Sequence, residues 1–155
     1  MEEHMKEPDY KHTQYGVLMF VVFIIVGILI TVVAIAIIAE GRVLAAVIMI
    51  CLTIAFMAMF FSSTVEVSAG KVRFWFGIGV VRKTIALTEI QSTRTVINPW
   101  YYFWGIKSIS GGWLYAIAPG PALEITLKDG KVIHFGSNQP AELKKAIEKA
   151  KQAVE

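Results

Sequence analysis

The chain has 155 residues, of which 55% are hydrophobic and 17% charged, and its formal net charge is +3. The high hydrophobicity comes mainly from two apolar runs, and the single cysteine excludes a disulfide framework or a thiolate zinc site. The length suffices for a membrane segment and one small soluble domain with its own core.

Residues 1–15 are a polar tail, and two apolar runs follow at residues 16–39 and 43–61. As helices, the runs would reach about 36 Å and about 28 Å, against a bilayer hydrocarbon core of about 30 Å. The short connection from Glu40 to Arg42 predicts a tight hairpin of two transmembrane helices, with both flanking segments on one side (residues 16–61). A signal peptide is the competing interpretation of the first run, but its apolar stretch is too long and a second span follows at once.

Lysine and arginine near the span ends predict the orientation of the hairpin. The turn has only Arg42, beside Glu40, whereas Lys6 and Lys11 precede the first run and more cations follow the second. Residues 62–155 contain 12 Lys and Arg against 7 Asp and Glu, a net charge of +5. We therefore predict a cell-membrane protein with two spans, cytoplasmic N- and C-termini, and a basic domain facing anionic membrane lipids.

The two runs contain no ionisable residue other than Cys51, so they lack the groups that a proton relay or ion pathway would need. We interpret Cys51 as a small apolar packing residue. Small residues recur on helical faces, and they predict packing of the hairpin on itself or, alternatively, against another membrane protein: Gly27, Thr31, Ala34, Ala55 and Ala58.

After the second run the pattern changes to the alternation of β-strands. Alternating apolar residues predict antiparallel strands at 64–68, 71–76 and 80–87, separated by turns at Ala69-Gly70 and at Gly77-Ile78-Gly79. Strands at 123–127 and 132–135 flank Asp129-Gly130, a strong hairpin signal. Ser137-Asn138 with Pro140 then predicts a helix whose apolar stripe is Leu143, Ala146, Ile147, Ala150 and Val154.

Several short motifs occur in a characteristic order: FGIG at 76–79, RKTI at 82–85, LTEI at 87–90, WGIK at 104–107, GGWLY at 111–115, and DG at 129–130 ahead of FG at 135–136. In this order, residues 64–154 resemble bacterial pleckstrin-homology-like domains that follow paired transmembrane helices. The resemblance implies an α+β fold for residues 62–155, with two orthogonal antiparallel sheets in a small barrel or sandwich capped by a C-terminal helix. It also implies a class that binds lipid headgroups, peptides or copies of itself, with no known reaction or ligand.

The segment 98–115, NPWYYFWGIKSISGGWLY, holds three of the four tryptophans. Such density is typical of a well-filled core, an aromatic belt at the membrane interface, or a partner-binding loop. We assign Phe103, Ile106 and Leu114 to the core, and Trp100, Tyr101 and Trp113 as possible membrane-interface or partner contacts.

Four basic residues fall on neighbouring predicted strands, which would bring them together near one edge: Lys71, Arg73, Arg82 and Lys83. They are candidate headgroup-binding residues. Lys71-Val72-Arg73 is similar to part of the basic pattern with which eukaryotic relatives bind phosphoinositides, but the full pattern is not present. The alternative is a solvated positive face that merely suits the anionic leaflet.

Nothing in the sequence points to catalysis, a metal or a cofactor. His4 and His12 lie in the tail without a partner at ligand spacing, and His134 is interpreted as a surface strand residue. Glu89 and Glu124 have no obvious partner for acid–base work. A modest excess charge without a basic helix or paired stacking motif also speaks against nucleic acid as a partner.

We therefore predict a non-enzymatic, membrane-anchored interaction or scaffold module that self-associates or recruits a partner at the cytoplasmic face. The alternatives are an accessory subunit of a membrane transporter or enzyme complex, and an anionic-lipid-sensing module.

Overall fold

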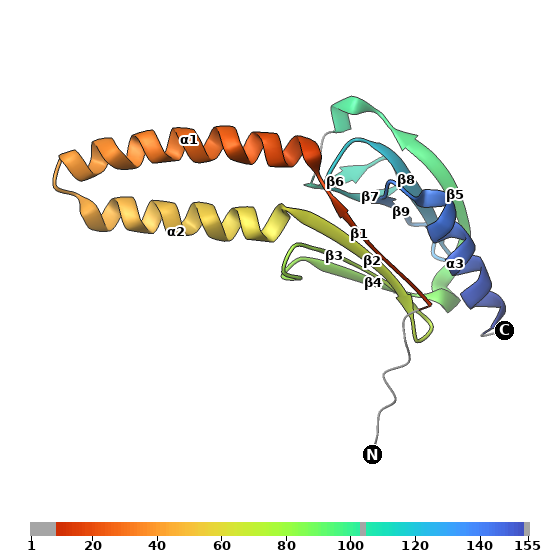
Figure 1. Ribbon diagram of the computed structural model, residues 1–155. Coiled ribbons are helices and arrows are strands. Elements are labelled where there is room, and N and C mark those ends of the chain that lie inside the picture. The colour runs from red at the N-terminus through yellow and green to blue at the C-terminus, as the bar shows by residue number, and fades with distance from the viewer. Residues whose placement is uncertain (1–8, 103–104, 154–155) are drawn as a thin grey trace, which may run out of the picture.

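The structure is a computed structural model that describes residues 9–102 and 105–153. The predictions for Phe103 and Val154 therefore lie outside the described residues. The described chain is α+β, with two apolar helices, two β-sheets and a C-terminal helix (Figure 1).

The two apolar helices are α1 (Val17–Ala39) and α2 (Val43–Phe60), and both are long and apolar enough to span a membrane. They pack side by side as a hairpin (Figure 1), with Ala34 and Ala46 buried. Gly27 faces α2, since a Cβ built on it would lie 3.8 Å from the Met57 methyl carbon. Thr31, Ala55 and Cys51 are instead exposed. The predicted packing of the hairpin on itself is therefore present at Gly27 and Ala34 but not at Thr31 or Ala55, and the packing role predicted for Cys51 is absent within the hairpin.

The helical hairpin is inserted between two neighbouring strands of one sheet. Strand β1 (Tyr10–Tyr15) pairs antiparallel with β2 (Ser62–Ser68), from Tyr10 opposite Val67 to Tyr15 opposite Ser62. Only Gly16 separates β1 from α1, and only Phe61 separates α2 from β2. The sequence analysis placed residues 10–15 in a polar tail and did not predict this strand.

The first sheet, called sheet 1, has the order β1-β2-β3-β4 and is antiparallel throughout. Its remaining strands are β3 (Lys71–Phe76) and β4 (Arg82–Ala86). Both were predicted from alternation, which turns Val72, Phe74 and Phe76 inward and the residues between them outward.

The second sheet, called sheet 2, has the order β5-β8-β9-β7-β6. Its strands are β5 (Ile90–Asn98), β6 (Gly105–Ile109), β7 (Gly112–Ala116), β8 (Gly120–Leu127) and β9 (Val132–Gly136). All its pairs are antiparallel except β7 with β9, which is parallel. Two short 3-10 helices flank β5: η1 (Leu87–Glu89) and η2 (Trp100–Tyr102).

The core lies between the two sheets and is covered at one side by α3 (Pro140–Gln152). Phe74 of sheet 1 stacks on Phe135 of sheet 2, with ring centroids 4.8 Å apart and an interplanar angle of 2°. Leu143, Ile147 and Ala150 of α3 are buried in the same core, as the predicted stripe required. Large aromatic contacts therefore join the sheets across the middle of the domain.

Two local predictions have different outcomes. The hairpin at Asp129-Gly130 is confirmed: Gly130 has φ +83° and its N–H donates to the Leu127 carbonyl at 2.9 Å. The predicted cap of α3 is wrong, because Gln139 occupies the cap position without a side-chain bond, and Ser137 Oγ accepts the Gln139 N–H at 3.1 Å. The polar residues before Pro140 thus stabilise the preceding turn rather than the helix end.

The predicted barrel does not form in the described residues. Strand β4 pairs only with β3, and β6 pairs only with β7, so the two sheets remain separate. The predicted all-antiparallel arrangement is also wrong at the β7–β9 pair. The result is an open sandwich with α3 at one side (Figure 1).

Candidate interaction site

The four candidate headgroup-binding residues do not share one face. Lys71, Arg73 and Arg82 lie on the outer face of sheet 1, whereas Lys83 lines a cleft on its inner side. The reason is the two-residue period of a strand, which turns the consecutive residues Arg82 and Lys83 to opposite faces. Sequence proximity therefore overstated how closely these side chains converge.

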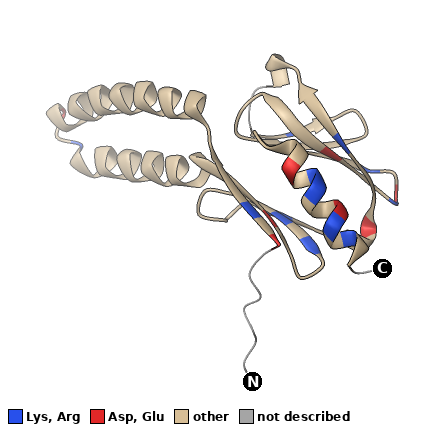
Figure 2. Cartoon of the chain, turned by 45° about the vertical axis from the view of Figure 1, so that its right-hand side comes forward, with Lys and Arg blue, Asp and Glu red and all other residues tan. Residues whose placement is uncertain are grey.

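On the outer face of sheet 1 the basic residues surround one carboxylate. Glu66 Oε1 lies 3.5 Å from Arg73 Nη1, and Glu66 Oε2 lies 3.9 Å from Lys11 Nζ. Lys11 Nζ also lies 5.7 Å from the centre of the Trp75 ring, a cation–π distance. Lys11 was missed as a member of this face because β1 was not predicted. Figure 2 shows Lys and Arg positions along the strands of sheet 1.

The three candidate aromatic contacts also separate. Trp100 and Tyr101 lie in η2 and are exposed, with ring centroids 6.1 Å apart. Trp113 lies on β7 and lines the same cleft as Lys83. Leu114 is fully buried, as predicted, but Ile106 is exposed, so its assignment to the core is wrong. Sheet 1 ends at β4, which leaves the inner side of β6 uncovered.

The cleft lies on the open side of the sandwich and has a volume of about 560 Å³, a size typical of ligand pockets. Its apolar lining includes Trp113, Tyr115 and Ile133. Burial of the Tyr115 ring raises the pKa of its phenol above 10.0. The polar lining is Lys83, Thr88, Glu89, Lys128, Asp129 and Lys131. Aromatic surface beside several cations can bind an apolar segment that also carries negative charge.

Within the cleft rim, Lys131 and Asp129 form a close ion pair at 2.7 Å. The hydrogen bond from Lys131 lowers the pKa of the Asp129 carboxyl, and the same bond raises the pKa of Lys131. This pair neutralises itself, so Lys83, Lys128 and Glu89 set the remaining formal charge of the rim, which is +1.

A second polar group lies on the outer face of sheet 2. Arg94 binds Glu124 with two hydrogen bonds of 3.2 and 3.1 Å, and His134 Nε2 lies 3.0 Å from Glu124 Oε2. The other ring nitrogen of His134 lies 2.8 Å from Asn98 Oδ1. His134 does alternate outward between Ile133 and Phe135, as predicted, but it is mostly covered and has partners.

The pKa of Glu124 reflects opposing effects. Burial raises it, but the hydrogen bonds and charges of Arg94 and His134 outweigh burial and hold the pKa below 4.5. Both carboxylate oxygens are engaged by neighbours on adjacent strands. The arrangement fixes the register of β5, β8 and β9 on this face, and sequence reasoning missed it because β5 was not predicted as a strand.

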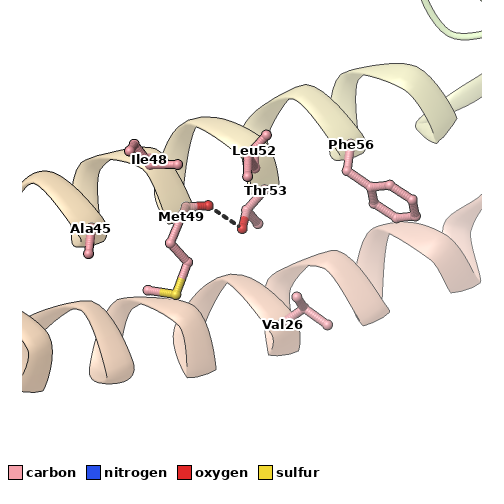
Figure 3. A pocket seen from close by; sticks show the side chains of 7 residues that line it. All are labelled: Val26, Ala45, Ile48, Met49, Leu52, Thr53 and Phe56. Atoms are coloured by element: carbon pink, nitrogen blue, oxygen red, sulfur yellow. Dashed lines mark hydrogen bonds between the residues drawn. The ribbon is translucent and has the colours of Figure 1, made fainter.

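A groove between α1 and α2 is a further concave surface, with a volume of about 590 Å³. Val26 of α1 and six residues of α2 line it (Figure 3): Ala45, Ile48, Met49, Leu52, Thr53 and Phe56. Thr53 donates its hydroxyl to the Met49 carbonyl at 2.9 Å, so its polar group is satisfied within α2. The groove therefore presents an apolar surface.

Within residues 9–102 and 105–153, no cluster of three or more His, Cys, Asp or Glu side chains is placed to hold a metal ion. No protein-family description, curated protein sequence or solved structure matches this chain.

Proposed function

We propose that this chain is a non-enzymatic, membrane-anchored interaction module. In this proposal α1 and α2 span the cell membrane, and the β domain recruits a partner protein at the cytoplasmic face. The observation that carries the proposal is the direct continuation of β1 into α1 and of α2 into β2, through Gly16 and Phe61 alone. Two one-residue connections prevent the domain from rotating freely, so each of its surfaces keeps a fixed direction relative to the bilayer.

The charge distribution supports cytoplasmic termini. The helical turn has one cation, Arg42, whose Nη1 lies 3.8 Å from a Glu40 carboxylate oxygen. At the other end of the hairpin, the outer face of sheet 1 carries Lys11, Lys71, Arg73 and Arg82 around the single Glu66. An excess of cations on one side of the spans favours the cytoplasm for that side.

The free edge of β4 is the surface best suited to a partner. The Phe76 N–H donates to the Val81 carbonyl and the Leu87 N–H donates to the Gly70 carbonyl. Ladder bonds alternate along an antiparallel pair, so the backbone groups of Lys83 and Ile85 face β3 and those of Thr84 face away. Thr84 therefore offers an N–H and a carbonyl to an added strand.

The cleft beside β4 indicates what that strand would carry. Trp113 and Tyr115 supply aromatic surface, and the rim has three lysines against two carboxylates. We therefore specify the partner as an extended segment with apolar and acidic side chains. The proposed pleckstrin-homology-like character of the domain agrees with this, because that class includes peptide-binding members.

The test starts from the full chain, tagged and extracted from its native membrane in mild detergent, with every protein in the particle identified and the particle mass measured. The decisive variant is Thr84→Pro, which removes the outward N–H of an edge strand without removing a β3–β4 ladder bond. Its matched control is Thr84→Ala, which keeps the N–H and loses the same side chain.

We expect a stoichiometric second protein with the wild type and with Thr84→Ala, and its loss with Thr84→Pro. A particle of several copies of this chain that responds in the same way would make the partner a second copy. Retention of the partner by Thr84→Pro would show that β4 is not the docking edge, and a single chain in every case would refute the interaction function.

A further inference from the structure

Five segments meet where the two sheets adjoin the helices, and we call this region the hairpin end: residues 15–18, 60–63, 77–81, 97–102 and 116–121. None of these segments contains a charged residue. Figure 2 shows the same absence of Lys, Arg, Asp and Glu beside the helix ends, in contrast to α3 and the far parts of the sheets. A domain surface without charge is unusual if it faces water.

On sheet 1, the hairpin end is formed by the β3–β4 turn, which lies directly against α2. The Gly77 N–H donates to the Ser62 carbonyl at 2.8 Å, and a Cβ built on Gly77 would collide with the Ala58 carbonyl oxygen. The turn therefore lies alongside the last turn of a helix that is apolar enough to span a membrane (Figure 1). At its tip, Ile78 is 68% exposed and Val80 is 65% exposed.

On sheet 2, the hairpin end is formed by the end of β5 and by η2. A Cβ built on Gly16 would lie 3.1 Å from the Ile117 carbonyl oxygen, which places the β7–β8 connection against the start of α1. Asn98 pairs with Gly120 at the end of that connection, so η2 follows at the same end of the sheet (Figure 1). Here Ile97 is 82% exposed and Trp100 is 74% exposed.

These two apolar edges flank the hairpin, one from each sheet. Exposed apolar patches of this kind mark a surface that another phase or molecule covers, and tryptophan and tyrosine are favoured where bilayer meets water. The edges are continuous with the apolar surface of α1 and α2, which lipid would surround if the helices span the membrane. This continuity and the lack of charge select lipid over a soluble protein as the occupant.

We infer that the β3–β4 tip (Ile78, Val80) and the β5–η2 segment (Ile97, Trp100, Tyr101) insert into the boundary between lipid headgroups and acyl chains. The inference rests on the membrane-spanning hairpin of the proposed function and adds two contacts that fix the tilt of the domain. Each contact is an apolar surface next to a helix end, and on the outer face of sheet 1 Lys11, Lys71 and Arg73 lie farther along the strands from the β3–β4 tip.

The test uses the full chain in phosphatidylcholine vesicles, with one spin label for each sample. The labelled positions are Ile78→Cys and Ile97→Cys, each in a Cys51→Ser background. Each has a matched control at the far end of the same or the adjoining strand: Ala69→Cys lies in the β2–β3 turn, at the other end of β3, and Gln91→Cys lies near the other end of β5. Native Cys51, exposed on α2, is labelled separately as a reporter of the span.

We expect labels at 78 and 97 to collide more often with lipid-soluble oxygen than with a water-soluble nickel complex, and labels at 69 and 91 to show the reverse. Nickel access at 78 and 97 equal to that at 69 and 91 would overturn the inference. Protection of 78 and 97 from both reagents would also overturn it, because protein would then cover them. If the label at Cys51 collides freely with the nickel complex, α2 does not lie in the bilayer. That result would refute the membrane-spanning hairpin of the proposed function, and it can be told apart from the other two outcomes.

Discussion

The two sheets differ in how they are attached to the helical hairpin. Sheet 1 is covalently continuous with both helices, because β1 leads into α1 and α2 leads into β2. Sheet 2 is connected to sheet 1 through η1 and through side-chain contacts in the core, including the stacked rings of Phe74 and Phe135. The hairpin therefore positions sheet 1 through the covalent chain, and sheet 2 through packing contacts, most of them in the core.

Because of this difference in attachment, the two sheets differ in their roles within the domain. Sheet 1 sets the orientation of the domain relative to α1 and α2. Its β4 edge therefore keeps a fixed position relative to these helices. Sheet 2 carries the exposed Trp113 and a polar group that fixes its own register, and η2 beside it carries the exposed Trp100. Surface residues of sheet 2 can therefore change without altering the connection of sheet 1 to the helices, provided that the core between the sheets stays intact.

The largest change in the free energy of unfolding is expected from a substitution that disrupts the core shared by the two sheets. Phe74→Ala removes a buried ring that contacts Phe76, Tyr115 and Phe135, and we expect it to lower the free energy of unfolding by about 3–5 kcal/mol. Unfolding by guanidinium in detergent can be followed by tryptophan fluorescence, since all four tryptophans lie outside the hairpin. The control Thr84→Ala, an exposed position on β4, should change stability by less than about 0.5 kcal/mol. A loss below about 1 kcal/mol for Phe74→Ala would mean that the sheets do not depend on this contact.

The contact between sheet 1 and α2 can be tested with two glycines of positive φ. Gly77 has φ +41° and no room for a Cβ beside the carbonyl oxygens of Ala58 and Met59, whereas Gly130 has φ +83° and nothing within 4 Å. Gly130→Ala should cost about 1–2 kcal/mol for backbone strain alone. Gly77→Ala should cost about 2–4 kcal/mol, because displacement of packed backbone adds to the strain. Equal losses in the same unfolding experiment would contradict the close approach of the turn to α2.

The sequence predicted the parts of the fold whose signals are local. The apolar runs, the alternation in β3 and the Asp129-Gly130 turn each follow from a few neighbouring residues, and the structure contains all three. Strand β5, QSTRTVIN after Ile90, was not predicted, because both of its sides carry polar residues and the burial of Asn98 depends on distant segments. Strand β1 was missed because its partner lies beyond the whole helical hairpin, at residues 62–68.

The candidate site shows the same limit. Residue types identified Lys71, Arg73, Arg82 and Lys83 as a basic group and Trp100, Tyr101 and Trp113 as an aromatic group. Strand alternation separated Lys83 from the other three basic residues, and Trp113 on β7 was separated from Trp100 and Tyr101 in η2. The cleft could not be predicted, because its lining comes from three segments far apart in the sequence, residues 83–89, 113–115 and 127–133. Which strands lie at the edges of a sheet depends on the order of all its strands and not on any local sequence pattern.

The contribution of the Arg94–Glu124–His134 group to the stability of sheet 2 can be tested separately from the core. Glu124→Gln should lower the free energy of unfolding at pH 7 by about 1–3 kcal/mol, because Arg94 and His134 lose a charged acceptor. In the wild type the folded-state pKa of Glu124 lies below 4.5. Its stabilising contribution is therefore complete above pH 4.5 and is lost as the pH falls through the folded-state pKa. The difference between wild type and variant should shrink in that acidic range, whereas Glu148→Gln on the exposed side of α3 should have little effect at either pH. A difference that stays constant with pH would contradict the charged role of Glu124.

The smallest energetic effect is expected at a second link between sheet 1 and the sheet 2 half of the domain, outside the core. His12 of β1 donates from Nε2 to Asn138 Oδ1 at 2.6 Å, and Gln14 Oε1 accepts the Asn138 N–H at 2.9 Å. These bonds join the edge of sheet 1 to the connection between β9 and α3. Because they are exposed, a double-mutant cycle of His12→Ala and Asn138→Ala should give a coupling energy of only about 0.5–1 kcal/mol. A coupling energy of zero would contradict a link at these bonds and leave the core as the main connection between the sheets. A coupling energy near the ~3–5 kcal/mol expected for the loss of Phe74, as large as a core contact, would show that β1 holds sheet 2 as strongly as the core does.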